Sequence, residues 1–72
     1  MDNQGLARWL YRYAERHYND SFGWSEIVEC WNISEIQAEL DQNKILDAEA
    51  AVQHFSEIVK IRSEAFEDAM NS

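Results

Sequence analysis

The stretch Phe22-Gly23-Trp24-Ser25-Glu26-Ile27-Val28-Glu29-Cys30-Trp31 decides the fold, because it holds two of the three tryptophans in a chain of 72 residues. As a helix over 24–31 it places Trp24, Ile27, Val28 and Trp31 at i, i+3, i+4 and i+7, which gathers them into one apolar stripe. The two glutamates of the stretch fall outside that stripe. The flanking segments must therefore supply the surfaces that cover it.

The composition favours helices over strands. The chain has no proline and only two glycines, too few for the tight turns that a small all-β domain requires. Its length lies near the lower limit at which a single core outweighs chain entropy. We therefore predict one helical domain over residues 1–72.

Hydrophobic periodicity predicts four helices in this domain. The turn formers of 19–23, ending in Gly23, are expected to end the first helix. The predicted ranges are 4–18, 24–31, 35–42 and 48–70. The sequence thus predicts an all-α bundle of about four helices, in which two longer terminal helices enclose two short ones.

Residues with capping chemistry precede three of these helices. Ser21 or Ser25 is expected to cap the second helix. Ser34 and Gln37 form a capping-box pattern at the start of the third, and Asp47 is a good N-cap for the fourth. These residues set the expected helix starts.

Two residues of the last helix do not fit a simple amphipathic pattern. Arg62 falls among apolar residues, so it must snorkel, pair with a carboxylate or face a partner. Ile61 points partly away from the apolar face. An exposed isoleucine suggests a structural homo-oligomer in which this helix pairs with its copy through Ile61, Phe66 and Met70.

The charge is strongly negative and unevenly distributed. Fourteen acidic and six basic side chains give a formal net charge of −8, and twelve of the acids lie in residues 20–72. The negative electrostatic field of such a chain disfavours direct contact with nucleic acid or an anionic membrane. An acidic surface can serve solubility alone. The alternative is a partner protein with a basic surface.

No residue pattern points to an enzyme, a metal site or a cofactor. Cys30 cannot form an internal disulfide, and its neighbour Glu26 would raise rather than lower the pKa of a thiol. The two histidines stand alone on different predicted helices, and no Cys/His set has zinc-like spacing. Without a signal-peptide pattern or an apolar run of membrane length, we expect a non-enzymatic cytoplasmic protein.

The first helix carries the only concentrated positive charge. Arg8, Arg12 and Arg16 follow one another at i, i+4 and i+8. The favoured interpretation is a set of intramolecular ion pairs with Glu15 and with acids of neighbouring helices. The alternative is a contact with a phosphate or an acidic peptide, for which guanidinium groups are well suited.

The acidic helices carry the candidate binding residues. Carboxylates on rigid helices occupy a basic site at little ordering cost. The candidate residues for a secondary contact are Arg62 and the arginine row of the first helix, Arg8, Arg12 and Arg16. The candidate partner-binding acids are Glu26, Glu29, Glu35, Glu39, Asp41, Glu57, Glu64 and Glu67.

The order of helices also fits a helix-turn-helix regulator with 35–42 as the recognition helix. That segment presents three carboxylates, Glu35, Glu39 and Asp41, and no cation to a phosphate backbone. These carboxylates would repel the phosphates of DNA, whereas DNA binding requires cations that displace the counterions of the phosphates. This remains the least favoured alternative.

The segment from His17 to Trp31 resembles a pattern found in small uncharacterised acidic proteins of phages and mobile elements. In that pattern His-Tyr, a short turn ending in Gly-Trp and Ile-Val-Glu-Cys follow one another, as they do here. The resemblance implies a phage-type accessory protein in the host cytoplasm. Many such acidic proteins block host machinery, including nucleic-acid-binding defence complexes, so the resemblance favours an inhibitor. The acidic helices would let it occupy a basic site as a mimic of DNA.

Overall fold

A computed structural model describes residues 3–71, which form four helices. Helix α1 spans Asn3–Arg16, α2 spans Phe22–Cys30, α3 spans Ile33–Gln42 and α4 spans Ala48–Asn71. No strand occurs in the described residues. The predicted all-α bundle of four helices is confirmed, and each predicted range overlaps its helix with ends that differ by at most two residues.

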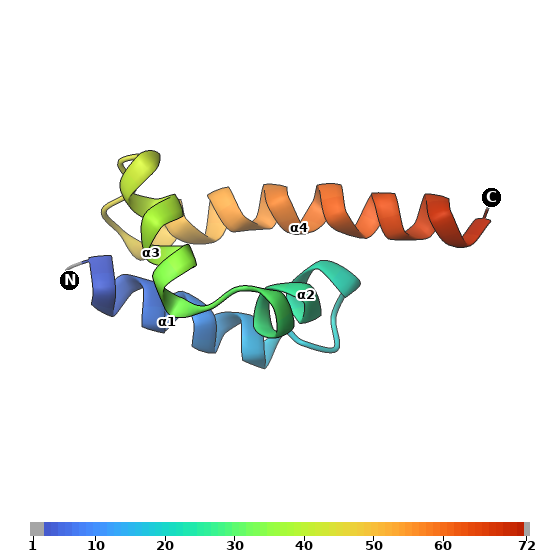
Figure 1. Cartoon of the computed structure of the whole chain (residues 1–72), viewed down its shortest axis with the longest axis horizontal. Helices are drawn as coiled ribbons and strands as arrows, with labels where there is room; N and C mark the ends of the chain where they lie inside the picture. Colours follow the sequence, from blue (N-terminus) through green and yellow to red (C-terminus); the bar gives the residue numbers. More distant parts are fainter. Residues whose placement is uncertain (1–2, 72) are drawn as a thin grey trace.

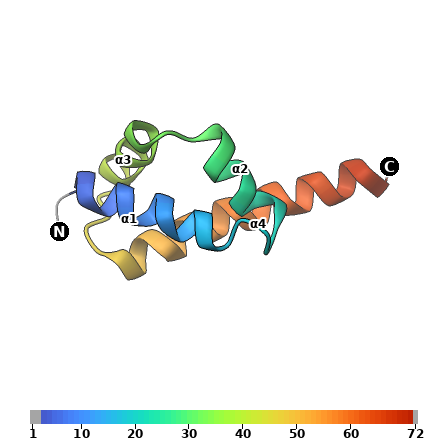
Figure 2. The same ribbon diagram turned by 90° about the horizontal axis from the view of Figure 1, so that it is seen from below.

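The long helix α4 runs along one side of the molecule, while α1 and α2 lie along the other (Figure 1). Helix α1 packs against α3, α2 and α4, and α2 packs against α4. The two longer helices therefore also touch each other directly. The carboxyl-terminal end of α4 extends beyond the other helices in both views (Figures 1 and 2).

The core is formed by the apolar stripes that the periodicity predicts. Trp24 is 8% exposed, and its ring meets Tyr13 edge-on at a centroid distance of 5.2 Å. Trp31 is only half-buried, with its ring edge-on against Phe55. The fully buried large side chains are Leu6, Leu10, Ile27, Ile36, Leu40 and Phe55.

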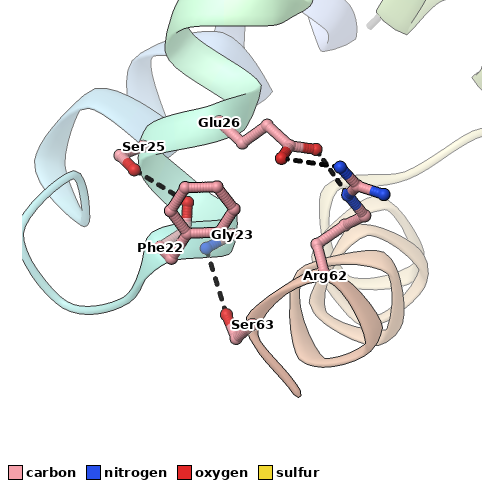
Figure 3. A network of polar contacts seen from close by, with 6 residues as sticks. All are labelled: Phe22, Gly23, Ser25, Glu26, Arg62 and Ser63. Atoms are coloured by element: carbon pink, nitrogen blue, oxygen red, sulfur yellow. Dashed lines mark hydrogen bonds and ion pairs between the residues drawn. The ribbon is translucent and has the colours of Figure 1, made fainter. Parts of the chain in front are cut away.

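Helices α2 and α4 cross closely at Gly23. A Cβ atom on Gly23 would lie 2.5 Å from the carbonyl oxygen of Val59 and 2.7 Å from its Cα, so only glycine fits there without moving a backbone. The Gly23 N–H donates a hydrogen bond to Ser63 Oγ at 3.0 Å (Figure 3). Gly23 lies inside the first turn of α2. The predicted break at 19–23 therefore extends too far: the chain does turn before Phe22, but Gly23 belongs to α2, where it permits close helix packing.

The helix caps agree only in part with the predictions. Asp47 Oδ1 accepts a hydrogen bond from the Ala50 N–H at 2.8 Å, so the predicted cap of α4 is confirmed. At α3 the capping box joins Asn32 and Glu35, which corrects the prediction of Ser34 and Gln37. Ser21 occupies the N-cap position of α2, but its side chain forms no capping hydrogen bond and its buried Oγ has no partner.

Helix α3 ends in a Schellman motif that directs the chain into α4. The N–H of Ile45 donates to Leu40 O, and that of Lys44 donates to Asp41 O. Lys44 holds φ at 55°, the left-handed conformation that this motif requires at the residue after the C-cap. Ile45 and Leu40, both buried, form the hydrophobic contact that accompanies the motif.

Candidate functional site

The carboxylate of Glu26 is joined to Arg62 across the interface of α2 and α4. Arg62 Nε and Nη2 donate to the two carboxylate oxygens at 2.7 and 3.0 Å (Figure 3). The Glu26 side chain is 15% exposed. The hydrogen bonds and the negative charge of Glu26 raise the pKa of Arg62. Of the three alternatives for Arg62, pairing with a carboxylate is therefore the one that the structure shows.

Glu29 also has an intramolecular partner. The Tyr18 hydroxyl donates a hydrogen bond to Glu29 Oε1, which ties the turn after α1 to α2. This hydrogen bond and the negative charge of Glu29 raise the pKa of Tyr18 above its ordinary value of 10.0. Both acids of α2 thus contribute to the packing of the bundle.

The three candidate acids of α3 also have partners within the chain. Glu35 caps its own helix through Asn32. Glu39 Oε2 lies 2.8 Å from His54 Nε2 of α4 and also accepts a hydrogen bond from Asn43. Asp41 accepts a hydrogen bond from Asn3. Five of the eight candidate acids are therefore engaged within the chain.

The acids of α4 differ from these five. Glu57, Glu64 and Glu67 are exposed and form no hydrogen bond or ion pair through their side chains with residues 3–71. Asp68 is exposed and unpaired in the same way. Helical periodicity places all four away from the buried residues Ala51, Phe55 and Val59. We call Glu57, Glu64, Glu67 and Asp68 the acidic face of α4.

An exposed isoleucine lies beside this acidic face. Ile61 is 62% exposed, with Glu57 four residues before it and Glu64 three residues after it on the same side of the helix. Met70 is 70% exposed, whereas Phe66, at 41%, stacks on Phe22 with ring centroids 4.2 Å apart. The three residues expected in a helix pair therefore do not share one surface, because Phe66 faces α2.

A shallow groove of about 680 Å³ lies where the loop after α3 meets α4. Its lining includes Asn43, Ile45, Val52, His54 and Glu57. Glu57 therefore borders both the groove and the exposed isoleucine. A side chain of a partner protein that contacts Glu57 has apolar surface available on either side.

The arginine row of α1 is not paired as expected. Arg8, Arg12 and Arg16 are exposed, and none forms an ion pair with a carboxylate of residues 3–71. The expected intramolecular pairs are thus absent from the described part of the chain. Half-buried Trp9 lies among these arginines and packs against Tyr13 with ring centroids 5.6 Å apart.

Two further residues belong to these faces besides the candidate binding residues. Asp68 extends the acidic face by one turn beyond Glu64, and Trp9 supplies an aromatic surface beside the arginine row. Helical spacing in the sequence indicates both residues. Asp68 follows Ile61 by seven residues and Trp9 precedes Arg12 by three, so each pair lies on one side of its helix.

The remaining reactive groups form no cluster. Cys30 is a free, exposed cysteine at the end of α2. His17 lies against Tyr13 and Trp24, with its Nδ1 atom 2.5 Å from Asp20 Oδ2. Within residues 3–71 no three His, Cys, Asp or Glu side chains are grouped as a metal site would require. The same residues contain no helix with the length and apolar character needed to cross a bilayer.

Comparison with known proteins identifies no relative of this chain. No protein-family model, curated protein or solved structure matches this chain.

Proposed function

We propose that the protein is a non-enzymatic binding protein whose acidic face on α4 occupies a basic surface of another protein. The observation that supports this is the division of the candidate acids. Those of α2 and α3 have partners within the chain, whereas Glu57, Glu64 and Glu67 have none. Unpaired carboxylates are the ones available to a partner's lysines and arginines.

Helix α4 suits this role mechanically. Its 24 residues make a rod of about 36 Å. Its inner side is held by α2 through Val59, Arg62 and Ser63, so the carboxylates of the outer side are carried on an ordered backbone. Binding then costs little backbone ordering, and the charge attraction accelerates the encounter with a cationic partner.

The finer proposal is that the basic surface is a nucleic-acid-binding site of a host protein, which the acidic face blocks as a mimic of DNA. It is supported by the net charge of −8 and by the resemblance of residues 17–31 to phage-type proteins. Such a site is built of lysines and arginines that neutralise phosphates. A row of fixed carboxylates presents them with the same charge.

The experiment is an affinity capture with two matched variants. The purified chain, E57Q/E64Q/E67Q and E15Q/E29Q/D41N are immobilised separately and exposed to the same bacterial lysate. Both variants remove three negative charges, but only the first alters the outer side of α4. Captured proteins are quantified by mass spectrometry, with elution in increasing salt and, separately, by duplex DNA.

The proposal requires a protein that the wild-type chain and E15Q/E29Q/D41N capture equally and that E57Q/E64Q/E67Q loses. That protein should elute in salt, because interactions between exposed charges are largely screened at about 1 M. Equal capture by both variants would show that the acidic face is not the contact. Elution by duplex DNA supports the finer proposal, and retention in its presence contradicts it.

A further inference from the structure

The molecule carries two oppositely charged faces on opposite sides. The buried residues of α1 are Leu6, Ala7, Leu10 and Ala14, and helical periodicity places the arginine row on the reverse side of that helix. The acidic face likewise lies on the reverse of the buried side of α4. Helices α1 and α4 lie on opposite sides of the bundle (Figure 1). From helical periodicity we therefore expect the two charged faces to point away from each other.

Each face has an apolar residue among its charges. On α1, Trp9 is followed by Arg12 and Arg16 at i+3 and i+7. On α4, Ile61 is followed by Glu64 and Asp68 at the same two intervals. An apolar side chain at the border of a charged surface gives a mixed composition that is common in protein interfaces.

The intervals of the two faces therefore match. Residues at i+3 and i+7 lie on one side of a helix, at about 4.5 and 10.5 Å along its axis. A pair of guanidinium groups beside Trp9 and a pair of carboxylates beside Ile61 thus have the same spacing. The two faces are therefore opposite in charge and similar in the length of helix that their charges occupy.

The net charge does not prevent such a contact. The bundle measures 21 by 19 Å across its shorter axes, whereas the Debye length is about 8 Å at physiological ionic strength. The acids on one side are therefore largely screened from a molecule that approaches the other side. Close to α1, an approaching group meets Arg8, Arg12 and Arg16 with Glu15 as the neighbouring acid of that helix.

We propose that the partner of the arginine row is the acidic face of a second copy of this chain. In this contact Trp9 of one copy lies against Ile61 of the next, with arginine and carboxylate side chains beside them. The contact is heterologous, and its two faces point in opposite directions, so copies associate into open chains rather than closed dimers. It covers Ile61 and pairs three arginines that have no carboxylate partner within residues 3–71.

This inference does not rest on the proposed function, although both use the acidic face. A basic partner protein and the arginine row of a second copy would compete for the same carboxylates. Exposed ion pairs are individually weak, so the association is expected to require a high protein concentration and to respond strongly to salt. A partner with a larger basic surface would displace it.

The test uses the purified full chain in sedimentation equilibrium, with no other macromolecule. Ionic strengths of about 0.15 and 1 M give Debye lengths of about 8 and 3 Å. The protein concentration is about 1 mM, so that an association with a millimolar dissociation constant is detectable. At the lower ionic strength the weight-average mass should be at least about twice the 8.5 kDa of one chain. At the higher value it should return to 8.5 kDa.

Charge reversal identifies the two faces. R8E/R12E/R16E and E57K/E64K/D68K should each remain monomeric, because each then carries two faces of like charge. Mixing the two variants should restore the association, since each face of one variant is again opposite in charge to a face of the other. R8K/R12K/R16K keeps the charge and should associate as the wild-type chain does. All the substituted residues are exposed, and circular dichroism checks that each variant is folded.

The inference is overturned if the wild-type chain stays at 8.5 kDa in both salts, or if the mixture of reversed variants stays monomeric. Association that persists at about 1 M salt would also overturn it and would indicate apolar pairing of α4 instead. If the chain stays monomeric but retards duplex DNA at low salt, the arginine row binds phosphates rather than a second copy. R8E/R12E/R16E keeps the acidic face, so the capture experiment succeeds or fails independently.

Discussion

The inner and outer sides of α4 differ in what they contact. On the inner side Val59 lies against Gly23, Arg62 pairs with Glu26, and Ser63 accepts a hydrogen bond from the backbone of α2. On the outer side the acidic face forms no polar contact with residues 3–71. The carboxylates of one small acidic protein thus divide into those that hold the fold and those that remain available. Net charge alone does not distinguish the two groups.

The largest effect should come from Trp24 of α2, whose ring packs against Tyr13 and His17. Trp24→Ala removes a ring that is 8% exposed, and we expect a loss of about 4 kcal/mol in the free energy of unfolding. Chemical denaturation followed by circular dichroism measures it. Ile61→Ala, at a residue that is 62% exposed on the outer side of α4, should change it by less than about 0.5 kcal/mol. A fully stable Trp24→Ala variant would place this tryptophan in a binding surface instead.

The close crossing of α2 and α4 should be nearly as sensitive. Gly23→Ala puts a methyl group 2.5 Å from Val59 O, so the two backbones must separate at a cost of about 3 kcal/mol. Ser63→Ala is the comparison, because it removes one hydrogen bond without adding volume and should cost about 1 kcal/mol. Equal losses for the two variants would show that the hydrogen bond, not close approach, explains this glycine.

A smaller change of opposite sign is expected where the chain enters α4. Lys44 adopts φ 55°, a conformation that glycine adopts without steric cost. Lys44→Gly should therefore raise the free energy of unfolding by about 1 kcal/mol. Lys44→Ala removes the same charge but keeps the Cβ atom, so it should give no gain. A gain in both variants would attribute the effect to charge.

The engagement of an α2 carboxylate can be tested by titration. Since the pKa of Tyr18 in the folded chain is raised above 10.0, its hydrogen bond to Glu29 stabilises the fold fully below that pH. This contribution is lost as the pH rises through the raised value. Ultraviolet absorbance should show a late tyrosine ionisation, above pH 10.0. Tyr18→Phe should remove that late step, and Glu29→Gln should move it towards 10.0. A late step that persists in both variants would contradict the contact.

Periodicity predicts the helices and most of the core, because burial of Leu40 or Phe55 follows from local spacing. The ambiguities arise where one residue type serves two purposes. Glycine ends helices and also permits close crossings, so Gly23 was misassigned. Asn32 and Ser34 both have capping chemistry, and the structure selects Asn32.

The division of the acids could not be predicted in the same way. Glu26 meets Arg62 at a separation of 36 residues, which depends on how α2 crosses α4. The sequence did contain a signal, since a cation among apolar residues of the last helix needed a partner. It did not identify which carboxylate, and therefore could not show which acids stay free.

The most direct measurement of the central claim is the affinity of the captured partner for the two matched triple variants as a function of salt. E57Q/E64Q/E67Q should remain folded, with an unfolding free energy within about 0.5 kcal/mol of the wild-type chain, because it alters no contact of the inner side. Its affinity should fall and its dependence on salt should weaken, while E15Q/E29Q/D41N should bind as tightly as the wild-type chain. Equal affinities and equal salt dependence for the two variants would contradict a function of the outer side of α4.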